Sequence, residues 1–344
     1  MLRPKKNYMA SRNIKRRTIV ITLGGLLLLV AAAISSLQYG STNYSIQTVM
    51  DVLLSNEESG QASQIILDIR MPRMVVALLI GGYLAVSGAI MQGLTRNALA
   101  EPGLLGISSG AAFVLVIALA IVPGLSTFGT TAAAMLGATI AMVLIVLLAS
   151  YVKGGASPVK LTLAGMAIGM FLTSLTTAIS LYFDVTKDMS FWYAGSLSTA
   201  TWDDARLLVI FGAIAIPVLI YLLHPLTLLR FGEDVASSLG VRIKIVQLLS
   251  IITILLLTGS SVSVAGAISF VGLIVPHISK MLVGGDFRYM IPVSTVLGSL
   301  LLVLADVGSK LMNPPFETPV GVVTALLGVP FFLYLIQRKG GSMK

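Results

Sequence analysis

Ten apolar segments, separated by polar or charged connections, occupy most of the sequence. They lie at residues 18–38, 71–92, 104–122, 128–151, 161–183, 204–223, 245–264, 268–283, 290–305 and 319–336. A helix needs about 20 apolar residues to cross the hydrocarbon core of a bilayer. The chain is 56% hydrophobic and only 11% charged, whereas roughly a quarter of the residues of soluble domains are charged. The sequence therefore predicts an all-α polytopic membrane protein with about ten transmembrane helices.

The number of spans depends on the segment at 268–283, which is short and directly follows its neighbour. It could instead be re-entrant, which would leave nine spans. Basic residues favour the cytoplasmic side of a membrane. With ten spans and a cytoplasmic N-terminus, 18 of the 23 Lys and Arg residues fall on that side. Because an odd number of spans would separate the two basic termini, the charge pattern favours ten spans with both termini cytoplasmic.

The apolar segments indicate a single transmembrane domain at residues 18–337, between a basic N-terminus at 1–17 and a tail at 338–344. A basic start before an apolar run also fits a secretory signal, but no clear small-residue cleavage site follows this run. We therefore expect an uncleaved first helix. The net charge of +9 is explained by the basic cytoplasmic side and by contact with anionic lipid. Membrane lipid is thus an expected partner, and nucleic acid is not.

The sequence lacks the residues that several kinds of chemistry require. The sequence has no Cys and only two His, His224 and His277, so a metal site is not expected. A phosphate-binding P-loop requires Lys and then Ser or Thr after a Gly-rich run, and neither Gly-Lys-Ser nor Gly-Lys-Thr occurs. ATP, if it is used, must be hydrolysed by another chain. We expect no catalytic residue and no cofactor on this one.

Residues 68–112 form a hydrophobic stretch that is interrupted by small and helix-ending residues. Asn97, Glu101 and Pro102 are expected to end one helix, and Gly103 allows the next to begin. The small residues that would let helices pack backbone to backbone are Gly81, Gly82, Ser87, Gly88 and Gly93. This stretch resembles the signature region of FecCD/BtuC-like permease subunits, which import iron-siderophores, haem and cobalamin in ATP-binding-cassette (ABC) uptake systems.

The resemblance covers most of the chain, from about residue 40 to 337, apart from variable outer loops. It also rests on three further segments, GAISFVGLIVPHISKMLVGGDFR at 266–288, LADVGSK at 304–310 and ETPVGVVTALLGVPFFLYLI at 317–336. It implies the fold of a type II ABC importer permease.

The cytoplasmic connection at about 225–244 contains a short amphipathic segment. Pro225 is expected to end the sixth span, Glu233 to begin a short helix and Gly240 to end it. By itself the segment could be a solvated loop that caps a helix. The resemblance implies that it docks in a cleft of an ATPase subunit, where ATP and Mg are bound, with Val235, Ala236 and Leu239 on one side. The matching segment comprises Gly232, Glu233, Asp234, Val235, Ala236, Leu239, Gly240 and Val241.

Three basic residues lie on the outer side, against the general charge bias. Arg70 and Arg73 flank Pro72, and Lys310 follows Asp306 by four residues. The arginines could bind lipid headgroups, and Lys310 could form an i,i+4 ion pair with Asp306, worth only a few tenths of a kcal/mol when exposed. The resemblance implies instead that all three meet acidic side chains of a substrate-binding protein. Lys310 stands where the family usually has Arg.

The segment at 161–183 carries Met166, Met170, Ser174 and Thr177 on one face. Small polar residues of this kind either pack helices together or line a pathway, where adaptable Met side chains would suit a bulky cargo. Ser157 and Pro158, directly before this segment, are candidates for a gate on the inner side.

The resemblance implies the transmembrane permease subunit of an ABC importer for a ferric siderophore or related iron chelate, in the bacterial cytoplasmic membrane. The expected partners are a second permease subunit, identical or paralogous, two ATP-binding subunits and an extracytoplasmic substrate-binding protein. Cobalamin or haem is the alternative cargo.

Two other classes of function fit the residues less well. An ion-coupled secondary transporter normally needs an intramembrane carboxylate, but the 14 acidic residues are expected in loops or near the ends of spans. An intramembrane enzyme would need a catalytic group, and no helix-buried His-Glu or Asp pair is visible.

Overall fold

The computed structural model describes residues 5–55, 60–122, 124–151, 158–313 and 316–340, and this part of the chain forms helices without strands. In chain order they are α1 (Lys5–Gln38), α2 (Ile46–Ser55), α3 (Gln61–Gln64), η1 (Ile65–Arg70), α4 (Met71–Thr95), η2 (Pro102–Leu105), α5 (Ile107–Ile121), α6 (Thr127–Tyr151), α7 (Pro158–Tyr182), α8 (Thr186–Ala194), α9 (Trp202–Leu229), α10 (Glu233–Ser238), α11 (Ile243–Ile254), η3 (Leu255–Gly259), α12 (Ser260–Ala265), α13 (Val271–Val283), α14 (Phe287–Leu311) and α15 (Val320–Gly340).

Seven helical segments of the described chain are long and apolar enough to cross a membrane, and three shorter apolar helices accompany them. The seven are α1 from Ile14, the continuous run α3–η1–α4, α6, α7, α9, the run α11–η3–α12 and α14; the three are α5, α13 and the described part of α15. The prediction of an all-helical polytopic protein with about ten apolar segments is confirmed.

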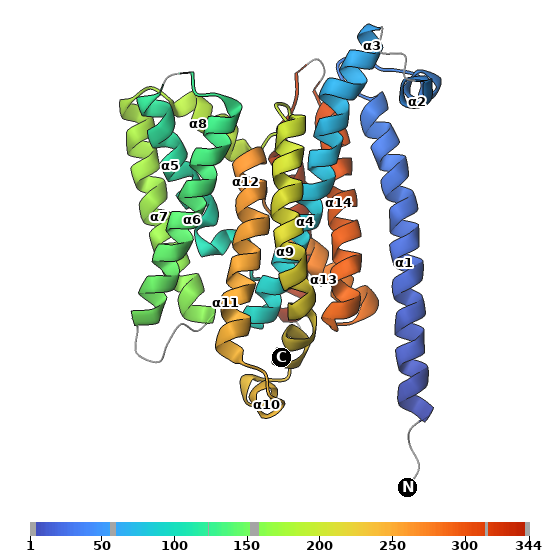
Figure 1. Cartoon of the computed structure of the whole chain (residues 1–344), viewed down its shortest axis with the longest axis vertical. Coiled ribbons are helices and arrows are strands. Elements are labelled where there is room, and N and C mark those ends of the chain that lie inside the picture. The colour runs from blue at the N-terminus through green and yellow to red at the C-terminus, as the bar shows by residue number, and fades with distance from the viewer. Residues whose placement is uncertain (1–4, 56–59, 123, 152–157, 314–315, 341–344) are drawn as a thin grey trace.

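The bundle has a centre and two flanks (Figure 1). The centre is α4, which packs against α14, α13 and α9. On one flank α5, α6 and α7 pack together, and on the other α1 lies against α14. The connection α10, the start of α1 and the end of α15 lie toward the same end of the bundle, as an even number of crossings requires.

The helical conformation is interrupted between α12 and α13. Gly266 takes a φ of 72° and Phe270 a φ of 71°, so the helix cannot continue through them. The N–H of Phe270 donates to Glu101 Oε1 at 2.8 Å, which satisfies one of the free N–H groups at the start of α13. With 13 residues, α13 is about 20 Å long by the α-helical rise. The segment predicted at 268–283 is thus a separate short helix, mostly buried in the bundle.

Glycines bring the central helices into backbone contact, as predicted. A Cβ atom at Gly88 of α4 would overlap the carbonyl of Gly272 of α13, and one at Gly81 would overlap the carbonyl of Gly298 of α14. Without side chains at these positions, α4 approaches both neighbours closely enough for extensive dispersion contact. These contacts fix the position of α4, whose first turn carries Arg73 and which follows Arg70, the last residue of η1.

We expect Gly88→Ala to lower the free energy of unfolding by about 1–3 kcal/mol, because an overpacked contact forces the two helices apart. The matched control is Gly24→Ala on α1, where an added Cβ meets no atom within 4 Å. The thermal unfolding temperature of the purified protein in detergent measures both. Equal unfolding temperatures for the two variants would contradict this account of α4 packing.

Four helix boundaries differ from those expected. α1 begins at Lys5 and not near residue 18, because the basic N-terminal segment continues the helix. The second span begins at Gln61, since η1 joins α3 to α4 without a break.

The end of α9 also differs from the expected one. α9 continues through Pro225 to Leu229, so the expectation that Pro225 ends the span is wrong. Proline is tolerated where packing and local adjustment satisfy the freed backbone groups. α5 begins at Ile107 after Gly106, whose φ is 68°, and not at Gly103.

Candidate functional site

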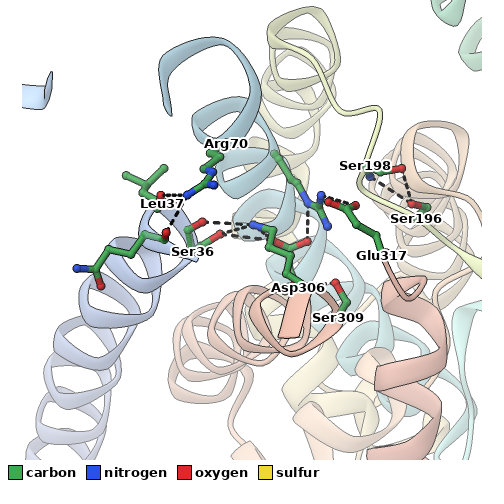
Figure 2. A network of polar contacts seen from close by, with 11 residues as sticks. Ser36, Leu37, Arg70, Ser196, Ser198, Asp306, Ser309 and Glu317 are labelled. Atoms are coloured by element: carbon green, nitrogen blue, oxygen red, sulfur yellow. Dashed lines mark hydrogen bonds and ion pairs between the residues drawn. The ribbon is translucent and has the colours of Figure 1, made fainter. Parts of the chain in front are cut away.

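A buried charge network joins α4 to α14 at the end of the bundle opposite α10 (Figure 2). Arg73 Nε lies 2.7 Å from Asp306 Oδ1, and Lys310 Nζ lies 2.8 Å from Asp306 Oδ2. Lys310 also donates to the carbonyl and the hydroxyl oxygen of Ser36 on α1. Asp306 is fully buried. One carboxylate therefore ties three helices together through two cations.

The second acid of this network is Glu317, on the connection between α14 and α15. Its Oε2 lies 2.7 Å from Arg73 Nη1. The Glu317 side chain is 41% exposed, whereas that of Arg73 is 7% exposed. Arg73 thus has a buried carboxylate on one side and a solvent-accessible carboxylate on the other.

Arg70 has a different role in the fold from Arg73. Its Nη1 donates to the carbonyls of Leu37 and Gln38 at 2.7 and 2.8 Å, and its Nη2 donates to the carbonyl of Thr42. The guanidinium also lies over the Tyr44 ring, 4.9 Å from its centroid. Arg70 therefore caps the C-terminal end of α1, where carbonyls have no partner within the helix. Among the described residues no carboxylate pairs with it.

The three basic residues predicted for docking lie at the same end of the bundle, and all three are buried. The ion pair between Lys310 and Asp306 forms and is buried, so its contribution is not limited to that of an exposed pair. The headgroup interpretation of Arg70 and Arg73 is wrong, because both guanidinium groups bond within the protein. Among the residues that the structure describes, three cations face two carboxylates here, which leaves one net positive charge.

At the other end of the bundle, α10 begins and ends as expected. Gly232 precedes it with a φ of 118°, and Gly240 follows it with a φ of 85°. Glu233, in its first turn, lies 3.3 Å from Arg96, which follows α4. This half-exposed pair ties α10 to the end of the central helix.

The expectation that Val235, Ala236 and Leu239 share one side of α10 is wrong. Ala236 is fully buried, while Val235 is 45% and Leu239 62% exposed. Val235 and Leu239 are four residues apart and share a face, and Ala236 lies about 100° away because the helix has 3.6 residues per turn. α10 is thus anchored through Ala236 and presents two apolar side chains outward.

The face of α7 proposed for a pathway points away from the helices of this chain. Met170, Ser174 and Thr177 are exposed, and Met166 is half-buried. The hydroxyls of Ser174 and Thr177 bond to carbonyls of their own helix. These exposed side chains therefore do not pack against other helices within the described part of this chain. Of the gate candidates, Pro158 is the first residue of α7, and Ser157 lies outside the described residues.

Two acidic residues of the structure were not expected in their observed surroundings. Glu101 lies in the connection between α4 and η2 and reaches the break before α13, and Glu317 completes the outer network. From the sequence, Glu101 was expected only to help end a helix, and Glu317 was given no role of its own. Their partners come from helices distant in sequence, so no local pattern could have identified them.

The comparisons with known proteins agree with this architecture. Residues 27–338 match the FecCD transport family. The chain is 44% identical over 321 residues to the iron(3+)-hydroxamate import system permease protein FhuB of Bacillus subtilis, covering 93% of this chain and 84% of that protein. It is 38% identical to the ferric enterobactin transport system permease protein FepD of Escherichia coli, covering 93% and 96%. It is 36% identical to the hemin transport system permease protein HmuU of Yersinia pestis, covering 91% and 94%.

A solved structure has the same fold. It is described as an inward-facing conformation of a metal-chelate type ABC transporter, and it superimposes with a TM-score of 0.81 at 29% identity, covering 93% of this chain and 99% of that one. The family match, the relatives and the solved structure thus indicate the same class of protein over nearly the whole length of the chain. The chain belongs to the FecCD transport family and is a multi-pass membrane permease of the ABC importer type.

Proposed function

We propose that this permease carries a ferric siderophore or a related iron chelate across the bacterial cytoplasmic membrane. One observation carries the proposal. Relatives that are 36% to 44% identical over more than nine-tenths of the chain are named for the import of iron(3+)-hydroxamate, ferric enterobactin and hemin. Two of these three cargoes are ferric siderophore chelates, which makes a chelate of that kind the first candidate.

The proposed assembly has two permease subunits, two ATP-binding subunits that hold ATP and Mg, and an extracytoplasmic substrate-binding protein. α10 and both chain ends face the cytoplasm, and the network around Asp306 faces outward. Import proceeds by alternating access, driven from the ATPase side. The shared end of α10 and the two termini supports this orientation, together with the basic character of the segments placed there.

The exposed face of α7 supports a pathway beside the second permease subunit. Ser174 and Thr177 place two hydroxyl groups on this face, and each hydroxyl oxygen can still accept a hydrogen bond while its proton bonds to a backbone carbonyl. Met170 beside them offers a soft, adaptable surface. In the proposed dimer these residues line the route, with Ser157 and Pro158 near its inner opening.

Uptake by the reconstituted transporter tests the proposal. Liposomes hold the permease with its ATP-binding subunits, and the binding protein is added outside with a ferric hydroxamate, ferric enterobactin, haem or cobalamin. We expect ATP-dependent uptake of a ferric siderophore and stimulation of the ATPase by its loaded binding protein. Uptake of haem or cobalamin alone would assign the other cargo. Uptake driven by an ion gradient without ATP would rule out the importer.

The outer network is the proposed docking site for the binding protein. Arg70, Arg73 and Lys310 would attract acidic side chains of that partner, since complementary charge guides encounter and fixes register. The excess positive charge of the network supports this proposal. Of the three, Arg73 pairs with a solvent-accessible carboxylate, Glu317.

We therefore expect Glu317→Gln to tighten binding of the substrate-binding protein. The change removes a carboxylate that competes for Arg73, and the gain is about threefold, because an accessible charge contact is worth up to about 1 kcal/mol. Binding of the purified proteins, measured against ionic strength, should show the gain shrinking as salt screens the charges. The matched control is Asp203→Asn, an exposed acid paired with Arg206 outside the network. Weaker binding by a folded Glu317→Gln variant would contradict the docking proposal.

A further inference from the structure

A basic cavity lies beside α10, where several helices end. It has a volume of about 460 Å³. Three cationic side chains line it from three different helix ends: Arg96 follows α4, Arg230 follows α9 and Lys280 lies near the end of α13. All three are exposed. Convergence of positive charge from separate elements on one cavity favours an anionic ligand.

Glycine and aromatic packing form the wall of this cavity. A Cβ atom at Gly285 would overlap the guanidinium of Arg230, and one at Gly93 would overlap the ring of Phe287. The guanidinium of Arg230 therefore lies against the backbone of Gly285, and this contact limits the directions that it can take. A guanidinium held in this way can pair with a carboxylate through two parallel hydrogen bonds.

The acidic residues of the permease near the cavity have partners of their own. Glu233 lies against Arg96, and Asp286 Oδ2 lies 2.7 Å from Arg288 Nη2. Partial burial raises the pKa of Asp286, but the hydrogen bonds from Arg288 lower it below its ordinary value. Among the described residues no carboxylate pairs with Arg230. Within the described part of the chain, the cavity thus keeps the positive charge of Arg230 without a carboxylate paired to it.

The contact between Arg96 and Glu233 makes the cavity continuous with α10. A partner that docks on the exposed Val235 of α10 and on Leu239 directly after it would lie next to the cavity, because Glu233 of the same helix contacts Arg96 in the cavity lining. From this continuity and the unbalanced charge we infer that the cavity receives an acidic side chain of the ATP-binding subunit, as a second docking contact beside α10. The inference rests on the proposed ABC assembly.

The test compares two double variants of the full-length permease. Arg230→Gln with Lys280→Gln removes two charges from the cavity. Arg16→Gln with Arg17→Gln removes two exposed charges from the start of α1, which stands apart from α10 (Figure 1). Affinity for the purified ATP-binding subunit is measured in nanodiscs over a range of salt concentrations. We expect the cavity variant to bind about tenfold more weakly at low salt, with the difference vanishing at high salt as the charges are screened, and the α1 variant to bind normally.

Arg230→Lys provides a finer comparison, since it keeps the charge but loses two-point pairing, and we expect a smaller loss. Equal binding by the cavity variant and the parent protein would overturn the inference. So would an equal loss in the α1 variant, which would show attraction to basic residues in general. If instead inorganic phosphate or anionic lipid stabilises the parent but not the cavity variant, while ATPase binding is unchanged, the cavity binds phosphate and the inference fails. Loss of ATPase binding in α10 variants but not in the cavity variant would leave the proposed function intact.

Discussion

A permease that carries Val235→Asp together with Leu239→Asp is expected to fold and insert but to import nothing. Both side chains are exposed, whereas the neighbouring Ala236 is fully buried and holds α10 against the bundle. The changes therefore leave the core intact and remove the apolar surface that α10 presents. Central apolar anchors of an interface are commonly worth about 2 kcal/mol or more each, so the ATP-binding subunits should not remain bound.

Co-purification of the ATP-binding subunits and ATP-driven uptake measure this expectation. The matched control is Met50→Asp with Leu54→Asp, which places two acids on exposed apolar positions of α2, at the opposite end of the bundle (Figure 1). It should leave co-purification unchanged. Glu233→Arg should act in the same direction as the α10 variant, because it sets a like charge beside Arg96. Normal import by the α10 variant would remove this helix from the coupling mechanism.

Long apolar segments could be predicted from the sequence because their signal is local and repeated. Each needs only a run of side chains that lipid accepts, and such runs are independent of what lies beside them. Helix ends were less predictable. The rule that proline ends a helix failed at Pro225, because α9 continues through it. The break at Gly266 was anticipated only as a boundary between two runs, since its stabilising carboxylate comes from Glu101, far away in the sequence.

The candidate site, like the fold, could be predicted from the sequence only in part. The start and end of α10 followed from glycine positions, but its orientation did not, because a six-residue helix can turn any face to the bundle. The outer cations were found by their exceptional placement against the charge bias. Their partners were not, since Arg73 and Asp306 are 233 positions apart and meet only when α4 packs on α14. The sequence therefore located the charges, while burial and pairing required the fold.

Asp306→Ala is expected to lower the free energy of unfolding by about 3–5 kcal/mol, the usual cost of leaving buried charges without their partner. Asp306 is fully buried and holds Arg73 and Lys310, whose side chains are 7% and 3% exposed. Its removal leaves two neighbouring cations that Glu317 balances only in part. Unfolding in mixed detergent micelles measures the loss. The control Asp203→Ala breaks an exposed pair with Arg206 and should have no measurable effect.

A triple variant, Arg73→Met with Asp306→Leu and Lys310→Met, separates the structural role of the network from docking. Replacing the buried members of an ion network by apolar side chains of similar size is often neutral or stabilising, because no buried charge is left unpaired. Glu317 loses Arg73 in this variant, but its side chain is 41% exposed and stays in contact with solvent. We therefore expect the triple variant to unfold at nearly the same free energy as the parent protein. It should nevertheless lose most of its affinity for the binding protein, because two of the three docking cations are gone. A stable triple variant that binds its partner and imports normally would show that these charges serve the fold alone, and the docking proposal would then be wrong.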